Sequence, residues 1–469
     1  MKNLLIIGAG TAGKQVVKQI LSNSKLNNIY NIVGFVDDSQ KNKQLKTCKI
    51  LGQIKDINSI FKKFNINEVI IAIPSASKEL INRIISSINE NGDNIDIKIV
   101  PGIYEIINGN FSYQQIRHIN PEDLLGREEV GFDIEKIYSY YQNKIVFVTG
   151  AGGSIGSEIF IQLLQLPIKK VIAFGHGENS IHNLIQKVGK DPRFTYVIGD
   201  IKDKTKLEYE INRFKPNIVF HAAAHKHLPL MENYPDEALK NNIIGTYNCA
   251  FASIKAKVEK FVLVSTDKAV NPTSIMGASK RIAEKIILSL NKNQNNTKFI
   301  LTRFGNVLGS RGSVIPIFLS QIEDKKPITI THPEITRFFM SIREAARLVI
   351  KSATIDDGNV FVLDMGKPIK ILDLAKNLIK IHGYNEKEIP IVFTGLRPGE
   401  KMYEETLTDN ENLSKTLYEK LFVSNENSTI MDKKEIETLV NKTLQIANTF
   451  DKKAIVGYIK NNVPEFINV

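Results

Sequence analysis

One pattern constrains the fold of this chain more than any other: an apolar run, a glycine-rich turn and a helical stretch follow one another twice. In the second copy, the apolar run at residues 144–148 leads into Gly150, Gly153 and Gly156. Glycines permit the sharp turn and let the backbone approach a phosphate, and the N–H groups at the following helix start face the turn. Further apolar runs, each spaced for an intervening helix, occur at residues 171–174, 195–199, 218–220 and 260–264. This alternation predicts a doubly wound parallel sheet in an α/β domain.

The first copy lies at the start of the chain, where the apolar run at residues 2–7 leads into Gly8, Gly10 and Gly13. Asp37 ends the next apolar run, about 20 residues later, where a Rossmann-like fold places a ribose-binding carboxylate. Two interpretations stay open. The turn forms a nucleotide or sugar-nucleotide site, or the domain keeps its turn and binds nothing catalytic, because no acid, base or nucleophile follows within this unit.

The 469 residues, 42% of them apolar, suffice for two or three domains with their own cores. We expect two Rossmann-like doubly wound domains, the second with a small C-terminal substrate-binding part. The expected division is an N-terminal nucleotide-binding domain at 1–105, a connector at 106–142 and a second domain at 143–469. Within the second domain, substrate-binding segments fall in 303–410 and a helical tail covers 430–469.

The charge and cysteine content exclude several classes of protein. The formal charge is +12, but the lysines are scattered instead of forming one basic stripe, so we expect no nucleic-acid partner and leave anionic ligands or a membrane surface open. Cys48 and Cys249 are too few for a disulfide framework or a zinc site, which fits a reducing cytoplasm. No apolar run reaches the ~18 residues of a spanning helix, and no signal peptide precedes the first strand. We expect a cytoplasmic protein.

The second glycine turn predicts a dinucleotide site. Ser154, Ile155 and Gly156 should present their backbone N–H groups to a pyrophosphate. Glu178 follows the next apolar run, and its carboxylate suits the free ribose hydroxyl of NAD and repels the 2′-phosphate of NADP. NADP stays open as the alternative, since His176 could accept a phosphate. The other residues expected to bind the cofactor are Gly150, Gly153, Asp200, Ile201, Ala222, Ala223 and Lys280.

A row of reactive side chains, Thr266, Asp267 and Lys268, follows the apolar run at 260–264. Such a row can be an ordinary turn with an ion pair, but polar groups at the carboxyl edge of a cofactor-binding sheet are typical of an active site. One helical turn apart, Met276 and Lys280 share a helix face. Lys280 corresponds to the lysine that holds the nicotinamide ribose in short-chain dehydrogenases, and Met276 stands where those enzymes carry a tyrosine, although it can also be a packing residue.

Three histidines, His221, His225 and His227, invite a metal interpretation. Neither a cysteine nor a paired carboxylate is close in sequence to complete the ligand set, so we expect no metal. We expect Lys226 and His227 to lie at the carboxyl edge of the sheet, near substrate or at a subunit contact.

A glycine-rich, cationic stretch at residues 302–316 is suited to a phosphorylated ligand, because arginine offers a planar fork for phosphate oxygens. Arginines in later loops add the same chemistry and favour a nucleotide diphosphate. The residues expected to bind substrate are Lys226, His227, Asn242, Arg303, Asn306, Arg311, Ser313, Val314, Arg337, Arg397 and Glu400.

Five motifs together carry a family resemblance, namely Gly150 to Glu158, His221 to Glu232, Ser265 to Arg281, Arg303 to Pro316 and Leu396 to Glu405. Over residues 143–410 the chain resembles the nucleoside-diphosphate-sugar dehydratases of polysaccharide and glycan biosynthesis, within the extended short-chain dehydrogenases. The first domain and the connector motif at 123–127 resemble the long members of that family, which usually carry transmembrane helices ahead of this point. The sequence departs from them there. Methionine in place of tyrosine resembles the UDP-N-acetylglucosamine 4,6-dehydratases that retain configuration at C5.

This resemblance implies a chemistry for the polar row. Hydride leaves C4 of a UDP-sugar for NAD, water is eliminated across C5 and C6, and hydride returns to C6. The elimination needs a base at C5, assigned to Lys268, and an acid at the C6 oxygen, assigned to Asp267, with Thr266 at the C4 oxygen. Desolvation should move both ionisable groups toward neutrality. The acceptor of the C4 hydroxyl proton stays open between water and Asp267.

Two other functions stay open from the sequence. A UDP-sugar 4-epimerase on the same fold would also take hydride from C4, without an elimination pair, and a regulatory protein would bind sugar nucleotides without turnover. Helices flanking such sheets commonly pair between subunits, so we expect a homo-oligomer by analogy.

Overall fold

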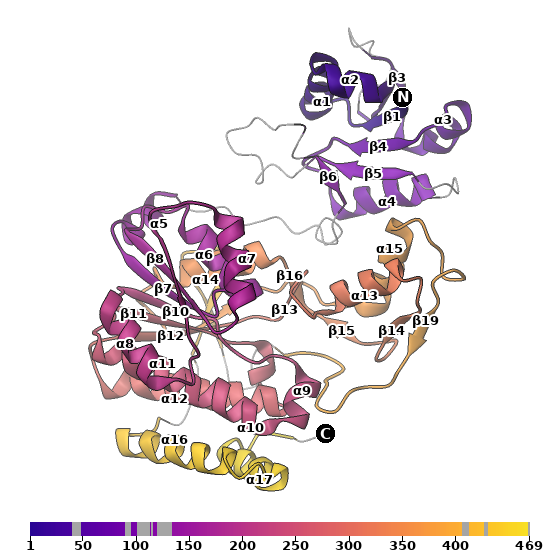
Figure 1. Cartoon of the computed structure of the whole chain (residues 1–469). Helices are drawn as coiled ribbons and strands as arrows, with labels where there is room; N and C mark the ends of the chain where they lie inside the picture. Colours follow the sequence, from indigo (N-terminus) through magenta and orange to yellow (C-terminus); the bar gives the residue numbers. More distant parts are fainter. Residues whose placement is uncertain are drawn as a thin grey trace. The chain divides into compact units, whose positions relative to one another are not determined.

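The computed structural model of the chain describes residues 1–39, 48–89, 95–100, 113, 116–119, 134–405, 412–425 and 430–467 (Figure 1). The chain divides into two compact units. The first unit comprises Met1–Gly131, Val314–Thr329 and Leu372–Val392, and the second comprises Phe132–Ser313, Ile330–Ile371 and Phe393–Val469. Among the helices of the described residues, none combines the length and the apolar character needed to cross a membrane.

The first unit contains a six-stranded sheet in the order β3-β2-β1-β4-β5-β6. Its pairings are parallel except that of β5 with β6. The strands are β1 (Lys2–Ile7), β2 (Tyr30–Val36), β3 (Ile50–Gly52), β4 (Glu68–Ile71), β5 (Asp96–Ile99) and β6 (Arg117–His118). The helices are α1 (Thr11–Ser22), α2 (Ser24–Ile29), the 3₁₀ turn η1 (Ile54–Asp56), α3 (Ile57–Lys63), α4 (Lys78–Asn89), α13 (Val314–Glu323) and α15 (Ile371–Ile381). Two short strands, β14 (Ile328–Ile330) and β19 (Ile391–Phe393), adjoin the inserted segments.

Apolar clusters cover both faces of this first sheet. One cluster joins the sheet to α1 through Val16, Val17 and Ile20. The other joins it to α3 and α4, and Ile381 of α15 packs against it. That contact explains why part of the expected second domain groups with the N-terminal residues. The expected boundary near 105 and the connector motif at 123–127 lie outside the described residues.

The second unit is built on a nine-stranded sheet in the order β20-β21-β17-β12-β11-β10-β7-β8-β9. The seven strands from β17 to β9 pair in parallel, whereas β21 pairs antiparallel with β17 and with β20. The strands are β7 (Ile145–Thr149), β8 (Lys170–Gly175), β9 (Phe194–Ile198), β10 (Ile218–His221), β11 (Lys260–Val264), β12 (Lys298–Arg303), β17 (Val360–Leu363), β20 (Leu413–Lys415) and β21 (Leu421–Ser424). Two small sheets pair β13 (Asn306–Val307) with β16 (Phe339–Met340) and β15 (Thr336–Arg337) with β18 (Ile369–Lys370).

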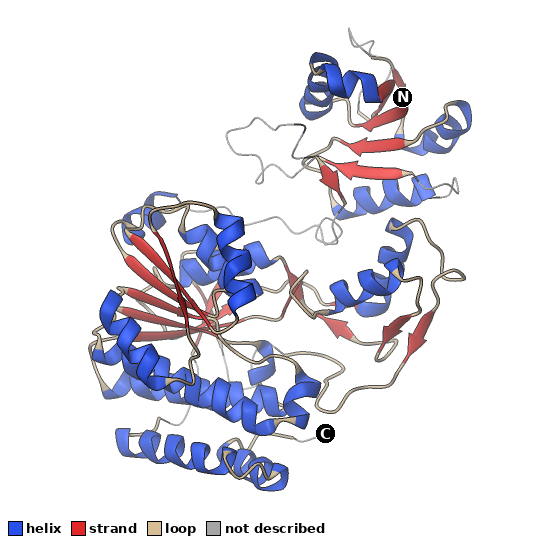
Figure 2. Cartoon of the chain, in the orientation of Figure 1, coloured by secondary structure: helices blue, strands red, loops and turns tan. Residues whose placement is uncertain are grey.

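Helices cover both faces of this sheet, giving three layers (Figure 2). One apolar cluster packs it against α5 (Ile134–Tyr141), α6 (Ser154–Leu163), α7 (Glu178–Val188) and α14 (Ile342–Ser352). The opposite cluster involves α8 (Lys204–Phe214), α9 (Leu228–Asn233), α10 (Pro235–Ala238), the π-helix η6 (Leu239–Gly245), α11 (Thr246–Lys255), α12 (Ile275–Asn293), α16 (Lys433–Ala447) and α17 (Lys452–Asn462). The expected α/β class with two Rossmann-like parallel sheets is thereby confirmed.

The strand order places the functional edge of the second sheet. The chain leaves β7 toward β8 on one side, and β10 lies on the other side, so the topological switch point falls between β7 and β10. Ligands of such sheets bind outside the carboxyl ends of the strands at this point. The strand β11, which carries the reactive row, is the next strand beyond β10.

The end of the described chain is tied to the loop that follows β11. The Ile467 N–H donates to the Pro272 carbonyl over 3.1 Å. The Arg281 guanidinium of α12 donates to the Glu465 carboxylate over 3.0 Å. The residues after α17 therefore brace the start of α12.

Candidate active site

Close contacts within the second unit require glycine at two positions of the turn after β7. Gly150 has a φ of +65°, and a β-carbon there would lie 2.7 Å from the Ala222 carbonyl oxygen at the end of β10. A β-carbon at Gly156 would lie 2.2 Å from the Gly150 carbonyl oxygen, so only glycine allows α6 to approach the turn. Gly153 is exposed just ahead of α6, where the first N–H groups of the helix have no partner within it. The turn thus has the shape and free donors that a pyrophosphate requires.

The structure places three other residues expected to bind the cofactor, Glu178, Asp200 and Ile201, in different environments. Glu178 is exposed at the first residue of α7, after β8, which pairs with β7. Asp200 accepts a 2.8 Å hydrogen bond from the Lys202 N–H and forms the turn after β9. Ile201 is 4% exposed and packs into the core beside Gly245, so its expected contact with the cofactor gives way to a packing role.

The first unit repeats the same geometry around its own turn. Gly8 has a φ of +104°, and a β-carbon there would lie 2.7 Å from the Ala72 carbonyl oxygen. A β-carbon at Gly13 would lie 2.0 Å from the Gly8 carbonyl oxygen. Asp37 accepts hydrogen bonds from the Ala9 N–H over 2.6 Å and from the N–H and hydroxyl of Ser39. The carboxylate expected at a ribose therefore holds this turn in shape.

The reactive row begins where β11 ends. The Thr266 hydroxyl caps the short 3₁₀ turn η7 (Asp267–Ala269) and donates to Asp267 Oδ1 over 2.8 Å. The Lys268 ammonium donates to the same oxygen over 3.0 Å. Asp267 is 1% exposed and the Lys268 side chain is 16% exposed. The three residues form one polar cluster, in which Asp267 is buried and Thr266 and Lys268 are half-buried.

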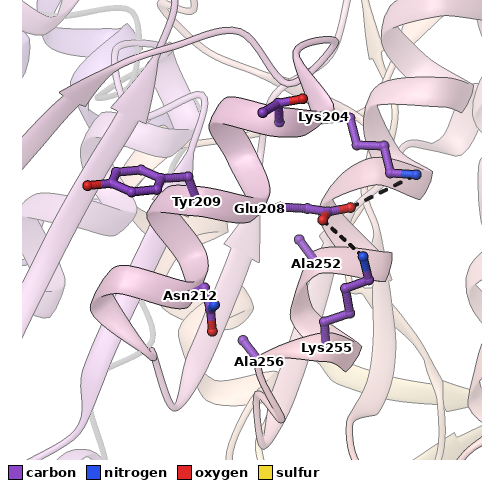
Figure 3. A pocket seen from close by; sticks show the side chains of 8 residues that line it. Lys204, Glu208, Tyr209, Asn212, Ala252, Lys255 and Ala256 are labelled. Carbon is purple, nitrogen blue, oxygen red and sulfur yellow. Dashed lines mark hydrogen bonds and ion pairs between the residues drawn. The ribbon is translucent and has the colours of Figure 1, made fainter.

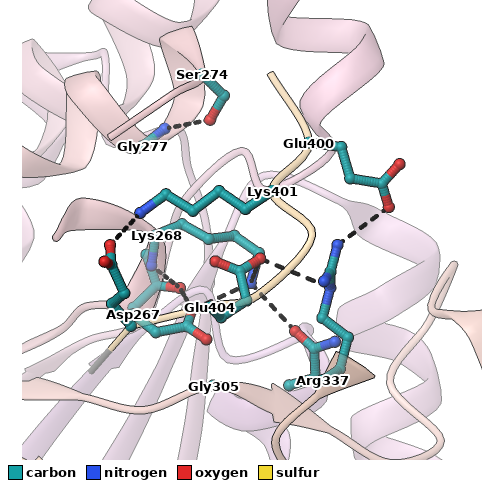
Figure 4. A network of polar contacts seen from close by, with 12 residues as sticks. Asp267, Lys268, Ser274, Gly277, Gly305, Arg337, Glu400, Lys401 and Glu404 are labelled. Carbon is teal, nitrogen blue, oxygen red and sulfur yellow. Dashed lines mark hydrogen bonds and ion pairs between the residues drawn. The ribbon is translucent and has the colours of Figure 1, made fainter. Parts of the chain in front are cut away.

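A second carboxylate, which the sequence did not indicate, joins this cluster. Glu404 Oε1 lies 3.2 Å from Lys268 Nζ, and its side chain is 3% exposed (Figure 4). Lys268 Nζ also donates to Asn306 Oδ1 over 3.2 Å. Glu404 comes from the segment after β19, far along the chain from β11, and no sequence spacing relates it to Lys268. The lysine is thus held by two carboxylates and an amide.

Among the described residues, no hydrogen-bond partner faces Asp267 Oδ2 or Glu404 Oε2, which are two buried oxygens of the cluster. A β-carbon at Gly305 would lie 2.9 Å from Asp267 Oδ2, so the absent side chain at Gly305 leaves that oxygen free. Unsatisfied buried oxygens are costly, and they are found where a ligand or a reaction uses them. The cluster is therefore prepared to receive a hydrogen-bonding group.

A prediction follows for Gly305. Replacing it by alanine would place a methyl group 2.9 Å from Asp267 Oδ2 and 3.2 Å from Phe338 Cβ, closer than ordinary contacts. Because the Gly305 backbone does not have a positive φ, we expect a folded protein with the carboxylate displaced and turnover reduced at least about 10-fold. Steady-state kinetics and the thermal midpoint measure this, compared with Gly457→Ala, a replacement at an exposed glycine of α17 that has no positive φ and where an added β-carbon would meet open space. A Gly305→Ala variant with unaltered turnover would contradict it.

The charges shift the pKa values of the cluster. Burial raises the pKa of the Asp267 carboxyl, and Glu404 adds to this effect while Lys268 opposes it. Burial alone would lower the pKa of the Lys268 ammonium, but the attraction of Asp267 and Glu404 outweighs it and the pKa is raised. Asp267 thus behaves as expected. Lys268 does not, because the expectation that it shifts toward neutrality considered desolvation and left out the attraction of Asp267 and Glu404.

Lys280 and Met276 lie at the start of α12. Lys280 Nζ donates to the Val264 carbonyl over 2.9 Å, and burial lowers the pKa of its ammonium to about 8. Met276 is 3% exposed and belongs to the apolar core below the sheet. Its thioether brings no acid–base chemistry, so the position that carries tyrosine in short-chain dehydrogenases has a packing side chain here.

The structure changes the role expected for Arg303. Its side chain is 0% exposed, and it donates to Glu284 over 3.0 Å from Nε and over 2.7 Å from Nη2. The Ser265 hydroxyl donates to the same carboxylate over 2.6 Å. A guanidinium enclosed in this way cannot reach a substrate phosphate. Arg303 and Glu284 instead anchor Ser265, the residue directly before the reactive row.

Asn242 is likewise a structural residue instead of a substrate contact. It is fully buried in the π-helix η6, a distortion that often marks functional regions. Its Oδ1 accepts from the His225 N–H over 2.8 Å, and its Nδ2 donates to the His225 carbonyl and to the Ser279 hydroxyl over 3.0 Å each. Asn242 therefore links the loop after β10 to α12.

His221 is buried between two threonines and neutral. Its Nδ1 lies 2.8 Å from Thr149 Oγ1, and its Nε2 lies 3.0 Å from Thr246 Oγ1. The Thr246 hydroxyl donates to the Asn242 carbonyl, so Nε2 carries the proton and Nδ1 accepts. Burial lowers the pKa of this imidazole to about 3. The lone pair on Nδ1 is therefore occupied by the hydrogen bond from the Thr149 hydroxyl.

The loops around the cluster bring together part of the expected substrate site. Lys226 Nζ lies 3.3 Å from the Ser310 hydroxyl. A β-carbon at Gly312 would lie 2.6 Å from the His227 ring, which requires glycine there. The buried Ser313 hydroxyl has no partner in the structure. These groups line the stretch that was expected to wrap a phosphorylated ligand.

Arginines of this region differ in their availability. Arg311 contacts the cofactor turn, its N–H donating to Ser154 Oγ over 3.1 Å and its guanidinium to the Gly152 carbonyl. Arg337 is 7% exposed and donates to the Met402 carbonyl and to Glu400. It therefore holds the segment that contains these two residues, instead of binding a phosphate as expected. Arg397 is exposed. Val314 begins α13 and belongs to the first unit.

A cavity of about 390 Å³ lies between α8 and α11 (Figure 3). Its lining includes Glu208, which lies 3.0 Å from Lys255 Nζ and 3.9 Å from Lys204 Nζ. None of the residues expected in the active site lines this cavity.

The geometry can now be compared with known proteins. Residues 146–426, more than half of the chain, match the family described as polysaccharide biosynthesis protein. The chain belongs to this family. Residues 1–101 match a CoA-binding domain. The capsular polysaccharide biosynthesis protein CapD of Staphylococcus aureus is 45% identical over 97% of this chain and 76% of its own length.

Two further proteins are similar to this chain over most of their own length. The probable polysaccharide biosynthesis protein EpsC of Bacillus subtilis is 48% identical over 89% of this chain and 70% of its own. The solved structure of Pen from Bacillus thuringiensis has a TM-score of 0.56 and 34% identity, covering 65% of this chain and 99% of that protein. The family resemblance seen in the sequence is confirmed by these matches.

Proposed function

We propose that this polysaccharide biosynthesis protein is an NAD-dependent UDP-N-acetylglucosamine 4,6-dehydratase. The observation that carries the proposal is the buried cluster of Thr266, Asp267 and Lys268 with its unpartnered Asp267 oxygen. An acid and an amine held together at the carboxyl edge of a dinucleotide-type sheet suit an elimination, which needs both. The relatives CapD and EpsC, named for polysaccharide biosynthesis, support a sugar-nucleotide substrate.

The residues of the second unit fit NAD. The glycine turn offers free N–H groups for a pyrophosphate, exposed Glu178 offers a carboxylate for a ribose, and Lys280 of α12 donates to the Val264 carbonyl at the end of β11. A carboxylate in this position favours NAD over NADP. When bound, NAD would take a hydride from C4 of the sugar and return it to C6.

The protein residues would perform the elimination between those two events. Asp267, whose carboxyl pKa is raised by burial, would donate a proton to the departing C6 hydroxyl. Lys268 would first release a proton from its ammonium to water, would then take the C5 hydrogen as a proton, and would return a proton to C5 when hydride adds to C6. Thr266 would hydrogen-bond the C4 oxygen. An Asp267 that already holds a proton is a poor base, which favours water as the acceptor of the C4 hydroxyl proton.

One incubation tests this function. The protein is mixed with UDP-N-acetylglucosamine and NAD in deuterated water, and the products are analysed by mass spectrometry. A dehydratase gives a product that has lost one water and gained deuterium at C5. An isobaric isomer would indicate a UDP-sugar 4-epimerase instead, and unchanged substrate would contradict both enzymatic functions.

A further inference from the structure

Glu404 adds a second carboxylate to the cluster formed by Thr266, Asp267 and Lys268. Three carboxyl groups, Asp267, Glu400 and Glu404, share two cations, Lys268 and Arg337. If all five were ionised, Asp267 and Glu404 would be two buried carboxylates that share the one ammonium group of Lys268. Like charges that share a buried site repel each other, so one of the carboxyl groups should hold a proton.

The contacts indicate which carboxyl group that is. Glu404 lies between both cations, with Oε1 at 3.2 Å from Lys268 Nζ and 3.6 Å from Arg337 Nε. Glu400 accepts from Arg337 over 3.2 Å and is less enclosed. Asp267 shares Lys268 with Glu404, is 1% exposed and has an unpartnered Oδ2. The shifts agree, since the pKa of Glu404 is lowered by Lys268 and Arg337 in spite of burial, whereas that of Asp267 is raised.

We propose that Glu404 is a positioning residue which serves as the buried counter-ion of Lys268 and thereby allows Asp267 to retain its proton. The inference rests on the proposed dehydratase function for its kinetic consequence, since Asp267 is the acid of that reaction. It does not rest on that function for the protonation itself. Glu404 acts through its neighbours and need not touch the substrate.

Other charged groups lie near Asp267 and Lys268 and influence the titration of these two residues. Arg337 comes from β15, Lys401 and Glu400 precede Glu404 in the same segment, and Lys226 in the loop after β10 is close enough to interact with Lys268. Lys401 is already bonded to Glu405 over 2.7 Å. Among these groups, Glu404 is the anion besides Asp267 that contacts Lys268 in the described residues.

The test is Glu404→Gln, which keeps the size of the side chain and removes its charge. Without that negative charge, Asp267 and Lys268 together bind fewer protons at a given pH, and both apparent pKa values of this pair fall. We expect both limbs of the pH profile of dehydration to move to lower pH by about 1 unit or more. Glu405→Gln, a neighbouring carboxylate whose side chain is 50% exposed, is the matched control and should leave the profile in place. An unshifted profile in Glu404→Gln would overturn the inference.

A spectroscopic readout is independent of turnover. The wild-type protein at neutral pH should show an infrared band of a protonated carboxyl group that disappears in Asp267→Asn and weakens in Glu404→Gln. A wild-type protein without an Asp267-dependent band refutes the inference even if Glu404→Gln does not fold. If no dehydration is detected but the band behaves as expected, the proposed function fails and the role of Glu404 stands.

Discussion

Replacing Lys268 by alanine is expected to abolish dehydration in a protein that still folds. Lys268 is the amine that contacts Asp267, Glu404 and Asn306, and a base of this kind contributes about 10²–10⁴ to the rate. Its removal also takes away the amine that the Asp267 and Glu404 carboxyl groups share, so the acid–base pair is lost. Product formation from UDP-N-acetylglucosamine, followed by mass spectrometry, measures the effect.

A surface lysine provides the control for this substitution. Lys292, exposed in the last turn of α12, can be changed to alanine with the same loss of charge and no contact to the cluster. It should keep wild-type turnover. Substantial 4,6-dehydratase turnover by Lys268→Ala would refute the assignment of the base.

The second large effect concerns stability. Changing Arg303 to methionine should lower the free energy of unfolding of the second unit by about 3–5 kcal/mol, because Glu284 would keep a buried charge without its main partner. The pKa of Glu284, lowered by Arg303 in spite of burial, should rise in this variant. Denaturant unfolding followed by circular dichroism gives the loss, read from the transition of the second unit.

A paired substitution separates charge from packing. The double variant Glu284→Gln/Arg303→Met removes both charges and should recover a large part of the lost stability, since no buried ion remains unpaired. A single Arg303→Met variant that costs less than about 1 kcal/mol would show that the pair is not a structural anchor.

The fold could be predicted from the sequence because its signals are local. Each glycine turn follows directly on its strand, and glycine is required there by contacts within a few residues or with the neighbouring strand, as at Gly156 and Gly13. The alternation of strands and helices then determines the sheet. The grouping of α15 with the first unit has no such signal, since it depends on an apolar contact made by Ile381 far from residue 100.

The active site could be predicted only where its residues are consecutive. Thr266, Asp267 and Lys268 are adjacent in the chain, and their cluster was expected. Arg303 seemed to be a phosphate ligand because an arginine in a glycine-rich stretch suggests one, and nothing in the sequence pairs it with Glu284. Glu404 escaped notice for the same reason, although it follows the noted Arg397 to Lys401 stretch. Residues that the fold brings together from distant segments cannot be paired from their spacing in the sequence.

The bracing of α12 by the residues after α17 has a consequence for biosynthesis of the protein. Ile467 and Glu465 contact Pro272 and Arg281, which flank the start of the helix that carries Lys280. A ribosome has therefore produced the whole reactive row long before it produces the residues that hold the neighbouring helix in place. The nascent chain should therefore acquire its final active-site geometry only after Glu465 and Ile467 have left the exit tunnel and can fold against the start of α12.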